Sequence, residues 1–246
     1  MIKYDISQFQ KDLKELHIVL SDRQLAQLMC YYELLVEKNK VMNLTAITEL
    51  DEVLKKHFVD SLSLVKVFDL NSEKKISLLD LGTGAGFPGI PLKIAFPNLQ
   101  ITLLDSLQKR ISFLQEVIDQ ISLDGIEALH GRAEDFAKPG LYRECFDLVV
   151  SRAVANLSTL SEYCLPYVKI GGYFISYKTD ETEMEQANYA VNILGGELRK
   201  QITFTLPNSD INRNLIVIEK CRPTPKQYPR KAGTASKKPI VNPQKL

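Results

Sequence analysis

The sequence predicts an α/β protein built on a seven-stranded sheet and preceded by an N-terminal helical cap. Three observations support this fold class. From Ile76 onward, apolar runs of strand length alternate with amphipathic stretches of helix length. The last two strand-like runs are separated only by the loop NSDIN (208–212), and residues 1–70 show helical periodicity. Alternating strands and helices form a parallel sheet covered on both faces, whereas the last two strands are expected to pair as an antiparallel hairpin.

The N-terminal segment begins its main helix at Ser21, which forms a capping-box pattern with Gln24. Apolar side chains then recur on one helical face, at Leu25, Leu28, Met29, Tyr32, Leu35 and Val36. The pattern fades at KNK (38–40), NLTAI (43–47) is expected to form a loop, and a helical pair is expected from Glu49 to Phe68. Because one face must be buried against the rest of the chain, we expect a cap rather than an independent domain.

The remaining elements are predicted from apolar runs and helical periodicity. The expected strands span residues 76–81, 100–106, 126–130, 145–153, 171–178, 198–207 and 213–220. The expected helices span residues 88–96, 107–122, 156–168 and 181–195, with 131–140 as a loop. Pro88 suits the first turn of its helix, where a backbone N–H has no helical partner.

Composition is that of an ordinary globular protein, with 246 residues, of which 45% are hydrophobic and 25% are charged. No stretch approaches the ~18 apolar residues of a membrane span, and the charged N-terminus does not resemble a signal peptide. The four cysteines lie far apart without a CxxC pair, and the three histidines lack metal-ligand spacing. We therefore expect reduced thiols, a cytoplasmic location and no metal site. Nothing in the sequence demands a dimer, so a monomer is expected.

The charge distribution is uneven although the net charge is only +1. Eight of the 31 Lys and Arg residues lie between Lys220 and Leu246, a segment without Asp or Glu, so this tail carries +8 and the rest −7. Basic arms of this kind bind nucleic acid, but a solvated tail that aids solubility is an equally good explanation of the charge alone.

The stretch LLDLGTGAGFPG (78–89) ends an apolar strand with a glycine loop. Such a loop at the carboxyl end of a parallel strand lets backbone N–H groups approach a ligand. The dinucleotide fingerprint G-x-G-x-x-G would require a third glycine where Phe87 stands, and no G-K-[ST] comes after the loop as in a P-loop. The pattern is instead G-x-G-x-G, formed by Gly82, Gly84 and Gly86 after Asp80.

The motif D-x-G-x-G-x-G resembles motif I of S-adenosylmethionine-dependent methyltransferases with the Rossmann-like class I fold, whose sheet also has seven strands with one antiparallel. Asp105, with Ser106 next to it, ends the second strand, where a carboxylate can accept hydrogen bonds from ribose hydroxyls. Nicotinamide enzymes use the same device, so Asp105 indicates a nucleoside rather than methyl transfer. The backbone at Ala133 and Glu134 is placed to contact an adenine edge.

The residues after the fourth strand narrow the choice of methyl acceptor. SRAVAN (151–156) is not the N/D-P-P-Y/F motif of adenine amino methylation, and Cys145 and Cys164 look structural rather than nucleophilic. An acceptor that needs no activation fits this pattern. Guanine N7 is such an acceptor, because its lone pair attacks the methyl group without loss of a proton, and catalysis then rests mostly on positioning.

The motifs together resemble the ribosomal RNA small-subunit methyltransferase G family, also called glucose-inhibited division protein B. The matching stretches are NLTAI, HFVDSL, LLDLGTGAGFPGIPLKI, DSLQKRISFL, GRAED, SRAVA and YPRKAGTASKKPI. The resemblance implies methylation of guanine N7 in the decoding-region loop of bacterial 16S ribosomal RNA, on free RNA or the small subunit. It divides the chain into a helical cap (1–70), a methyltransferase domain that binds S-adenosylmethionine (71–220) and a basic tail (221–246).

Carried over by motif, the expected cofactor residues are Asp80, Gly82, Gly84, Gly86, Phe87, Asp105, Ser106, Ala133, Glu134 and Arg152. Arg152 also faces the substrate, where it could hold a phosphate, pair with the guanine O6/N7 edge, or form a salt bridge with a carboxylate at the sheet end. The expected RNA-binding residues are Lys109, Arg110, Arg152, Arg230, Lys231, Lys237 and Lys238, beside the aromatic Tyr228.

Simpler explanations remain open for these cations. Lys109 and Arg110 could merely solvate a helix face, and PRKAG (229–233) could fold back onto the sheet. His57 and Asp60, one helical turn apart, favour a local hydrogen bond, while Asp60 beside the cofactor's ammonium or sulfonium is a sharper hypothesis. At the level of function, the alternatives are a non-enzymatic RNA-binding ribosome assembly factor with a relic cofactor pocket and a nicotinamide-dependent reductase, which Phe87 disfavours.

Overall fold

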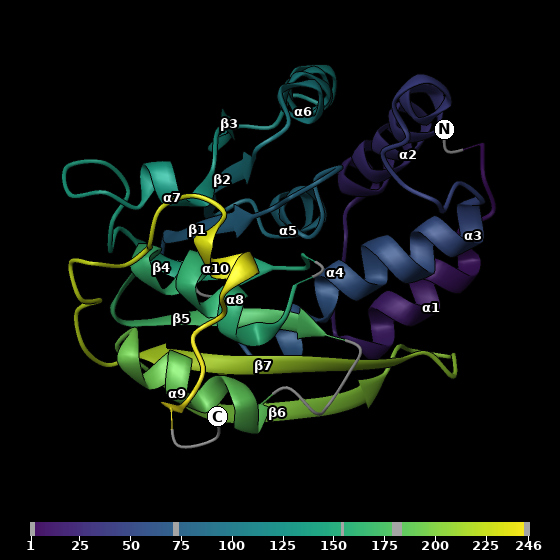
Figure 1. Cartoon of the computed structure of the whole chain (residues 1–246). Coiled ribbons are helices and arrows are strands. Elements are labelled where there is room, and N and C mark those ends of the chain that lie inside the picture. The colour runs from purple at the N-terminus through teal and green to yellow at the C-terminus, as the bar shows by residue number, and fades with distance from the viewer. Residues whose placement is uncertain (1–2, 71–73, 154, 179–183, 244–246) are drawn as a thin grey trace.

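The computed structural model describes residues 3–70, 74–153, 155–178 and 184–243 and contains the predicted seven-stranded sheet (Figure 1). The strands are β1 (Ile76–Leu81), β2 (Leu99–Asp105), β3 (Ile126–His130), β4 (Phe146–Ser151), β5 (Val168–Lys178), β6 (Gly196–Thr205) and β7 (Asn212–Lys220). Their order in the sheet is β3-β2-β1-β4-β5-β7-β6. Strands β1 to β5 pair in parallel, and β7 runs antiparallel to both β5 and β6. The predicted fold class is therefore confirmed.

Helices cover both faces of this sheet. The α-helices are α1 (Ser7–Glu15), α2 (Asp22–Met42), α3 (Leu50–Val53), α4 (Asp60–Leu62), α5 (Gly89–Ala95), α6 (Gln108–Gln120), α7 (Ala133–Phe136), α8 (Leu157–Cys164), α9 (Met184–Ile193) and α10 (Thr234–Lys237). The other helical turns are the π-helix η1 (Leu54–Val59) and the 3-10 turns η2 (Ser63–Lys66) and η3 (Leu165–Tyr167). The side chains of neighbouring strand residues point to opposite faces, so Leu78 packs with α5, α6 and the cap, and Leu79 packs with α8 and α9.

Two elements differ from their predicted form, and a third is described only in part. The expected helical pair at 49–68 is a run of short turns without a break, because a π-turn joins α3 to α4. The expected loop 131–140 contains the single helical turn α7. The helix α9 begins at Met184, and residues 181–183 of the expected helix lie outside the described residues.

The N-terminal cap is tied to the sheet by buried polar contacts as well as by apolar packing. Asp12 on α1 is 1% exposed and pairs with Lys55 of η1. The Lys55 ammonium also donates to the carbonyl of Pro207, in the loop between β6 and β7, and Asn208 donates to Asp12 at 2.9 Å. These contacts hold the cap against the loop between β6 and β7. The boundary of the cap at residue 70 stays a proposal.

The basic tail lies across the body of the protein, as the yellow segment of Figure 1 shows. Arg143 fixes its first part by donating to the carbonyls of Thr224 at 2.6 Å and Tyr228 at 2.8 Å. Farther along, Ala235 is 1% exposed and Ile240 is 8% exposed, and Ile240 belongs to the apolar cluster around α8 and α9. The tail therefore folds back onto the body, which is the second of the two arrangements that the sequence leaves open for PRKAG.

Candidate functional site

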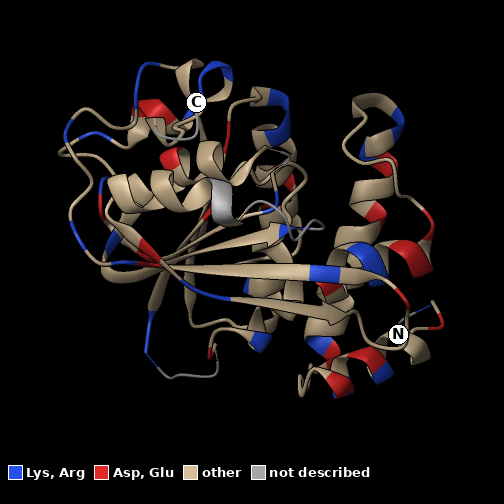
Figure 2. Ribbon diagram, turned by 60° about the horizontal axis from the view of Figure 1, so that its bottom comes forward, with Lys and Arg blue, Asp and Glu red and all other residues tan. Residues whose placement is uncertain are grey.

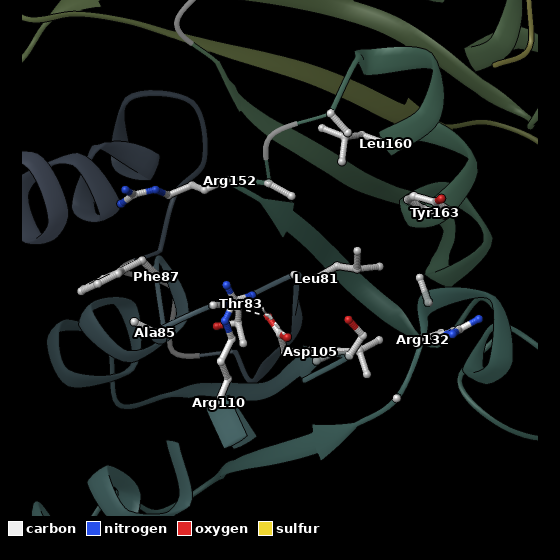
Figure 3. Close-up of a pocket in the computed structure, with 18 of the residues that line it drawn as sticks. Leu81, Thr83, Ala85, Phe87, Asp105, Arg110, Arg132, Arg152, Leu160 and Tyr163 are labelled. Atoms are coloured by element: carbon white, nitrogen blue, oxygen red, sulfur yellow. Dashed lines mark hydrogen bonds and ion pairs between the residues drawn. The ribbon is translucent and has the colours of Figure 1, made fainter. Parts of the chain in front are cut away.

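A cavity of about 820 Å³ opens where β1, β2, β3 and β4 end. This volume lies within the ~300–1,000 Å³ of small-molecule sites, and the position is the one that open α/β sheets use for ligands. Figure 3 shows that Phe87 and Arg152 lie on one side of the cavity and that Leu160, Tyr163 and Arg132 lie on the other. Of the expected cofactor residues, those that line the cavity are Gly82, Gly84, Phe87, Asp105, Ser106, Ala133, Glu134 and Arg152.

Asp80 and Gly86 do not line this cavity, and their predicted contact with a cofactor stays a prediction. Asp80 is fully buried beneath the glycine loop, where one carboxylate oxygen accepts the Thr83 hydroxyl at 2.7 Å and the Gly89 N–H at 2.8 Å. Burial raises the pKa of Asp80 to about 7, although these two hydrogen bonds act against the shift. A Cβ at Gly86 would come within 2.6 Å of Ile90 and 2.8 Å of the Tyr31 hydroxyl, so this glycine permits close packing. Asp80 and Gly86 therefore support the glycine loop on the side that faces the protein interior.

Gly84 is the point at which the loop backbone meets the cavity. Its φ of +63° lies in the left-handed region, and a Cβ built on it would have no atom within 4 Å. The open space above Gly84 is therefore a cradle that a side chain would fill. A ligand can lie directly against the backbone at this position.

Asp105 ends β2 and faces the same cavity while being only 4% exposed. Its carboxylate accepts the Gly84 N–H at 3.0 Å and the Leu107 N–H at 2.9 Å, and it pairs with the Arg110 guanidinium at 3.1 Å (Figure 3). A carboxylate has about four lone-pair sites. The two backbone N–H groups and Arg110 occupy most of these sites. Since the Arg110 side chain is 34% exposed, a diol that approaches from the cavity would compete with it first for the Asp105 oxygens.

The far wall of the cavity is built from separate segments of the chain. Ala133 and Glu134 come from α7, and Gly233 comes from the tail. The Glu134 carboxylate accepts the Gly233 N–H at 3.0 Å, and the Ala133 carbonyl accepts the Tyr167 hydroxyl. This arrangement places α7 and the tail side by side at one end of the site.

The near wall carries an aromatic and cationic cluster. The ring of His57 stacks on Phe87 with centroids 4.4 Å apart, and the guanidinium of Arg152 lies 5.6 Å from the Phe87 centroid. Arg152 pairs with Asp60 at 3.3 Å, and Arg213 from β7 pairs with the same carboxylate at 2.9 Å. One buried carboxylate thus serves two guanidinium groups, which leaves a net positive charge at this end of the cavity.

His57 and Asp60 do not form the expected local hydrogen bond, and Asp60 does not line the cavity. The Asp60 carboxylate pairs instead with Arg152 and Arg213, so the expected His57–Asp60 hydrogen bond is wrong. The hypothesis that Asp60 lies beside the charged groups of a cofactor stays a hypothesis. His57 bonds instead to the Thr45 hydroxyl at 2.9 Å through Nε2, and Nδ1 lies 3.4 Å from Arg152. Burial, together with the charge of Arg152, lowers the pKa of His57 to about 4.

The expected RNA-binding residues fall into two groups. Lys109, Lys231, Lys237 and Lys238 are exposed. Arg110, Arg152 and Arg230 are engaged within the protein by Asp105, Asp60 and Glu162 respectively. Figure 2 shows basic residues along the C-terminal segment, whereas the N-terminal helices carry both signs of charge. The roles assigned to all these residues stay predictions.

Several residues that shape the site have no role predicted from the sequence. Thr45 and Arg132 lie within NLTAI and GRAED, two of the motifs that carry the family resemblance, and both line the cavity. Tyr163 also lines it, and Arg213 orients Asp60 from a distant strand. No local pattern marks these last two residues, because only the folded chain brings them to the site.

Comparison with known proteins identifies the family. The model of the family described as rRNA small subunit methyltransferase G matches residues 24–215. The chain belongs to this family. Ribosomal RNA small subunit methyltransferase G of Lachnoclostridium phytofermentans is 54% identical over 239 residues, which cover 96% of the chain and 98% of that protein. The predicted family is confirmed, and the rRNA small subunit methyltransferase G family implies an enzyme that methylates ribosomal RNA.

Solved structures share the fold at low sequence identity. A SAM-dependent methyltransferase from Aquifex aeolicus has a TM-score of 0.50 and 17% identity, covering 68% of this chain and 92% of that one. TYW2 of M. jannaschii, solved in complex with AdoMet, has a TM-score of 0.53 and 13% identity, covering 70% of this chain and 77% of that one. These similarities support the class I methyltransferase fold for this member of the rRNA small subunit methyltransferase G family.

Metal ligation and membrane insertion have no candidates among the described residues. No group of three or more His, Cys, Asp or Glu side chains in this part of the chain could hold a metal ion. None of the described helices is both long and apolar enough to cross a membrane.

Proposed function

We propose that this protein transfers the methyl group of S-adenosylmethionine to N7 of a guanine in 16S ribosomal RNA. The observation that supports this most strongly is the cavity that joins the Gly84 cradle and Asp105 to the cationic Phe87–Arg152 wall. We further propose that the protein acts as a monomer in the cytoplasm, in keeping with its four free cysteines.

The residues around the cavity suit S-adenosylmethionine. Asp105 would hold the ribose, the backbone at Gly82 and Gly84 would face the amino acid part of the ligand, and Ala133 and Glu134 would face the adenine. When bound, this cofactor supplies an electrophilic methyl group on a sulfonium. The role of the chain is then to hold the acceptor in line with that methyl group.

The acceptor that we propose needs no proton removal. Guanine N7 attacks with a ring-plane lone pair, so alignment supplies most of the acceleration, which for well-oriented reactants is worth ~7–11 kcal/mol. His57 suits a positioning role better than that of a base, because both of its ring nitrogens have partners and its lowered pKa of about 4 makes it a weak base. The described residues that line the cavity include no cysteine that could act as a nucleophile.

Arg152 is proposed to face the RNA. Its side chain is 18% exposed, and it shares Asp60 with Arg213, so its charge is only partly neutralised. A guanidinium held over the Phe87 ring can donate to a phosphate or to the guanine O6. The salt bridge and the RNA contact are compatible, because the ion pair fixes the orientation of the planar group.

The experiment is methyl transfer with identification of the product. The protein is incubated with methyl-labelled S-adenosylmethionine and small-subunit ribosomal RNA, and the RNA is then digested to nucleosides. We expect the label in 7-methylguanosine. Label in another nucleoside would refute the proposed acceptor, and RNA binding without any transfer would indicate a non-enzymatic assembly factor.

A further inference from the structure

The tail reaches the candidate cofactor cavity by a defined route. Arg143 holds the carbonyls of Thr224 and Tyr228, and the chain then runs over α8 to Gly233, which lines the cavity. The carbonyl of Ala235, two residues later, accepts the Thr159 hydroxyl of α8 at 3.1 Å. The segment 228–238 is therefore fixed on both sides of the point where it meets the cavity.

Arg230 provides the strongest of these attachments. Its guanidinium donates to both carboxylate oxygens of Glu162, with Nε–Oε1 at 2.9 Å and Nη2–Oε2 at 2.5 Å, and its backbone N–H donates to Oε1 at 2.8 Å. The Glu162 side chain is 1% exposed. A bidentate pair with a buried carboxylate fixes geometry far better than an exposed ion pair does.

The paired residues Arg230 and Glu162 lie close in the chain to residues that line the cavity. Next to Glu162 stands Tyr163, which lines the cavity and packs against the apolar cluster that also contains Ile240 of the tail. Arg230 is three residues before Gly233, whose N–H is held by Glu134 of the same cavity. If Arg230 moved away from Glu162, the two lining residues Tyr163 and Gly233 would both lose their fixed positions.

We propose that residues 228–238 form a wall of the cofactor pocket and that Arg230 is the positioning residue of this wall. This inference rests on the proposed function, since the ligand of the cavity is taken to be S-adenosylmethionine. It gives Arg230 a role in cofactor binding in place of the RNA contact that the sequence suggested. The exposed Lys231, Lys237 and Lys238 remain available for RNA on the outer side of the same segment.

The test measures binding of S-adenosylhomocysteine by calorimetry, because this probe lacks the methyl group and cannot react. Arg230→Met is compared with Lys226→Met, which removes a charge from the same tail at an exposed position. We expect Arg230→Met to bind the probe roughly tenfold more weakly, a change of about 1.4 kcal/mol. The Lys226→Met protein is expected to bind it as the wild type does.

A double variant distinguishes an effect on the cavity wall from a general loss of stability. Arg230→Met leaves Glu162 buried without its partner, which destabilises a fold, whereas Arg230→Met with Glu162→Met removes both charges. The double variant is expected to melt near the wild-type temperature and still to bind the probe weakly. Arg230→Lys keeps the charge without the planar fork and is expected to restore only part of the affinity.

Steady-state kinetics provide the readout that a purely structural role would not give. We expect a raised KM for S-adenosylmethionine and an unchanged KM for RNA in the double variant. Wild-type affinity for the probe in both Arg230→Met proteins, single and double, would overturn the inference, as would a raised KM for RNA alone. If the wild-type protein fails to bind the probe at all, the proposed function fails instead.

Discussion

Asp105 is the residue on which the proposed ribose recognition depends, because its carboxylate is buried, faces the cavity and is already oriented by the Gly84 and Leu107 N–H groups. We expect Asp105→Asn to weaken S-adenosylhomocysteine binding by about 1.5–3 kcal/mol, the usual cost of a lost hydrogen bond to a charged group. Calorimetry measures this change. Asp147→Asn is the matched control, since Asp147 pairs with Lys169 near the start of β4, at the opposite end of the sheet.

Equal weakening by both aspartate variants would contradict the assignment, because it would show a general loss of folded protein. Unchanged affinity in Asp105→Asn would place the ribose elsewhere.

Individual side chains show where prediction from sequence succeeds and where it fails. The place of Asp105 at the cavity is predictable because ligands bind at the strand ends of a parallel sheet, which is a consequence of topology alone. The sequence does not decide whether Arg152 contacts RNA or a carboxylate. In the structure it forms an ion pair with Asp60. The contact of Arg213 with the same carboxylate could not be predicted, because Arg213 is 153 residues from Asp60 in the chain. Only tertiary packing defines such pairs.

The glycine loop is the element that lies most directly against the proposed cofactor position. A Cβ at Gly84 would enter open space in the cavity at a φ of +63°, and Gly140 offers a matched control with a φ of +82° and open space outside the cavity. Alanine in the left-handed region costs roughly 1–2 kcal/mol at either position. We expect both variants to be similarly destabilised, but only Gly84→Ala to lose affinity for S-adenosylhomocysteine, by about tenfold or more.

Thermal melts and calorimetry on the two proteins test this expectation. Tight binding by Gly84→Ala would mean that the ligand does not lie against this stretch of backbone.

Elements are predicted best where periodicity is long and regular. All seven strands appear in the structure, and the capping box at Ser21 and Gln24 starts α2 as expected. Three short features escape prediction: the π-turn at 54–59 and the single-turn helices α7 and α10. A turn of four to six residues carries too few apolar positions for its period to be recognised.

At the level of the whole molecule, RNA binding should depend on the exposed cations beside the cavity. Replacing Lys231, Lys237 and Lys238 together with alanine should lower the slope of log K against log salt by about 2, at ~0.7 for each phosphate contact to a single strand. A filter-binding titration over a range of salt concentrations measures the slope. The control replaces Lys11, Lys14 and Lys75, which are exposed on the cap and before β1. An identical slope for both triple variants would show that the tail does not contact RNA.

The pH dependence of stability should contain two opposing contributions. The pKa of His57 is lowered from 6.5 to about 4, so the unfolded state binds the extra proton and stability falls as pH drops from about 6.5 to 4. The pKa of Asp80 is raised from 3.8 to about 7, so the native state holds the extra proton and stability falls as pH rises from about 4 to 7. At ~1.4 kcal/mol per pKa unit, each effect is worth roughly 3–4 kcal/mol at most.

Urea unfolding of two variants separates these contributions. Relative to wild type, His57→Gln should gain stability as pH falls toward 4, whereas Asp80→Asn should gain stability as pH rises toward 7. Parallel curves for the two variants would contradict the opposite protonation states that burial gives these groups.

The overall charge distribution correctly describes the tail as basic, but composition gives no indication of what its cations contact. Arg230 pairs with a buried carboxylate, whereas Lys231 beside it is exposed. This difference arises because Glu162 lies on α8, directly beneath the returning chain, and no spacing rule links residues 162 and 230. The tail is therefore predictable as a charged segment but not as a part of the cavity.

The most direct measurement is a crystal structure of the protein with bound S-adenosylhomocysteine. We expect the ribose on Asp105, the adenine between α7 and the tail, and the sulfur directed toward Phe87 and Arg152. A ligand found outside this cavity, or a cavity closed by the glycine loop while the ligand binds elsewhere, would contradict the proposed cofactor site.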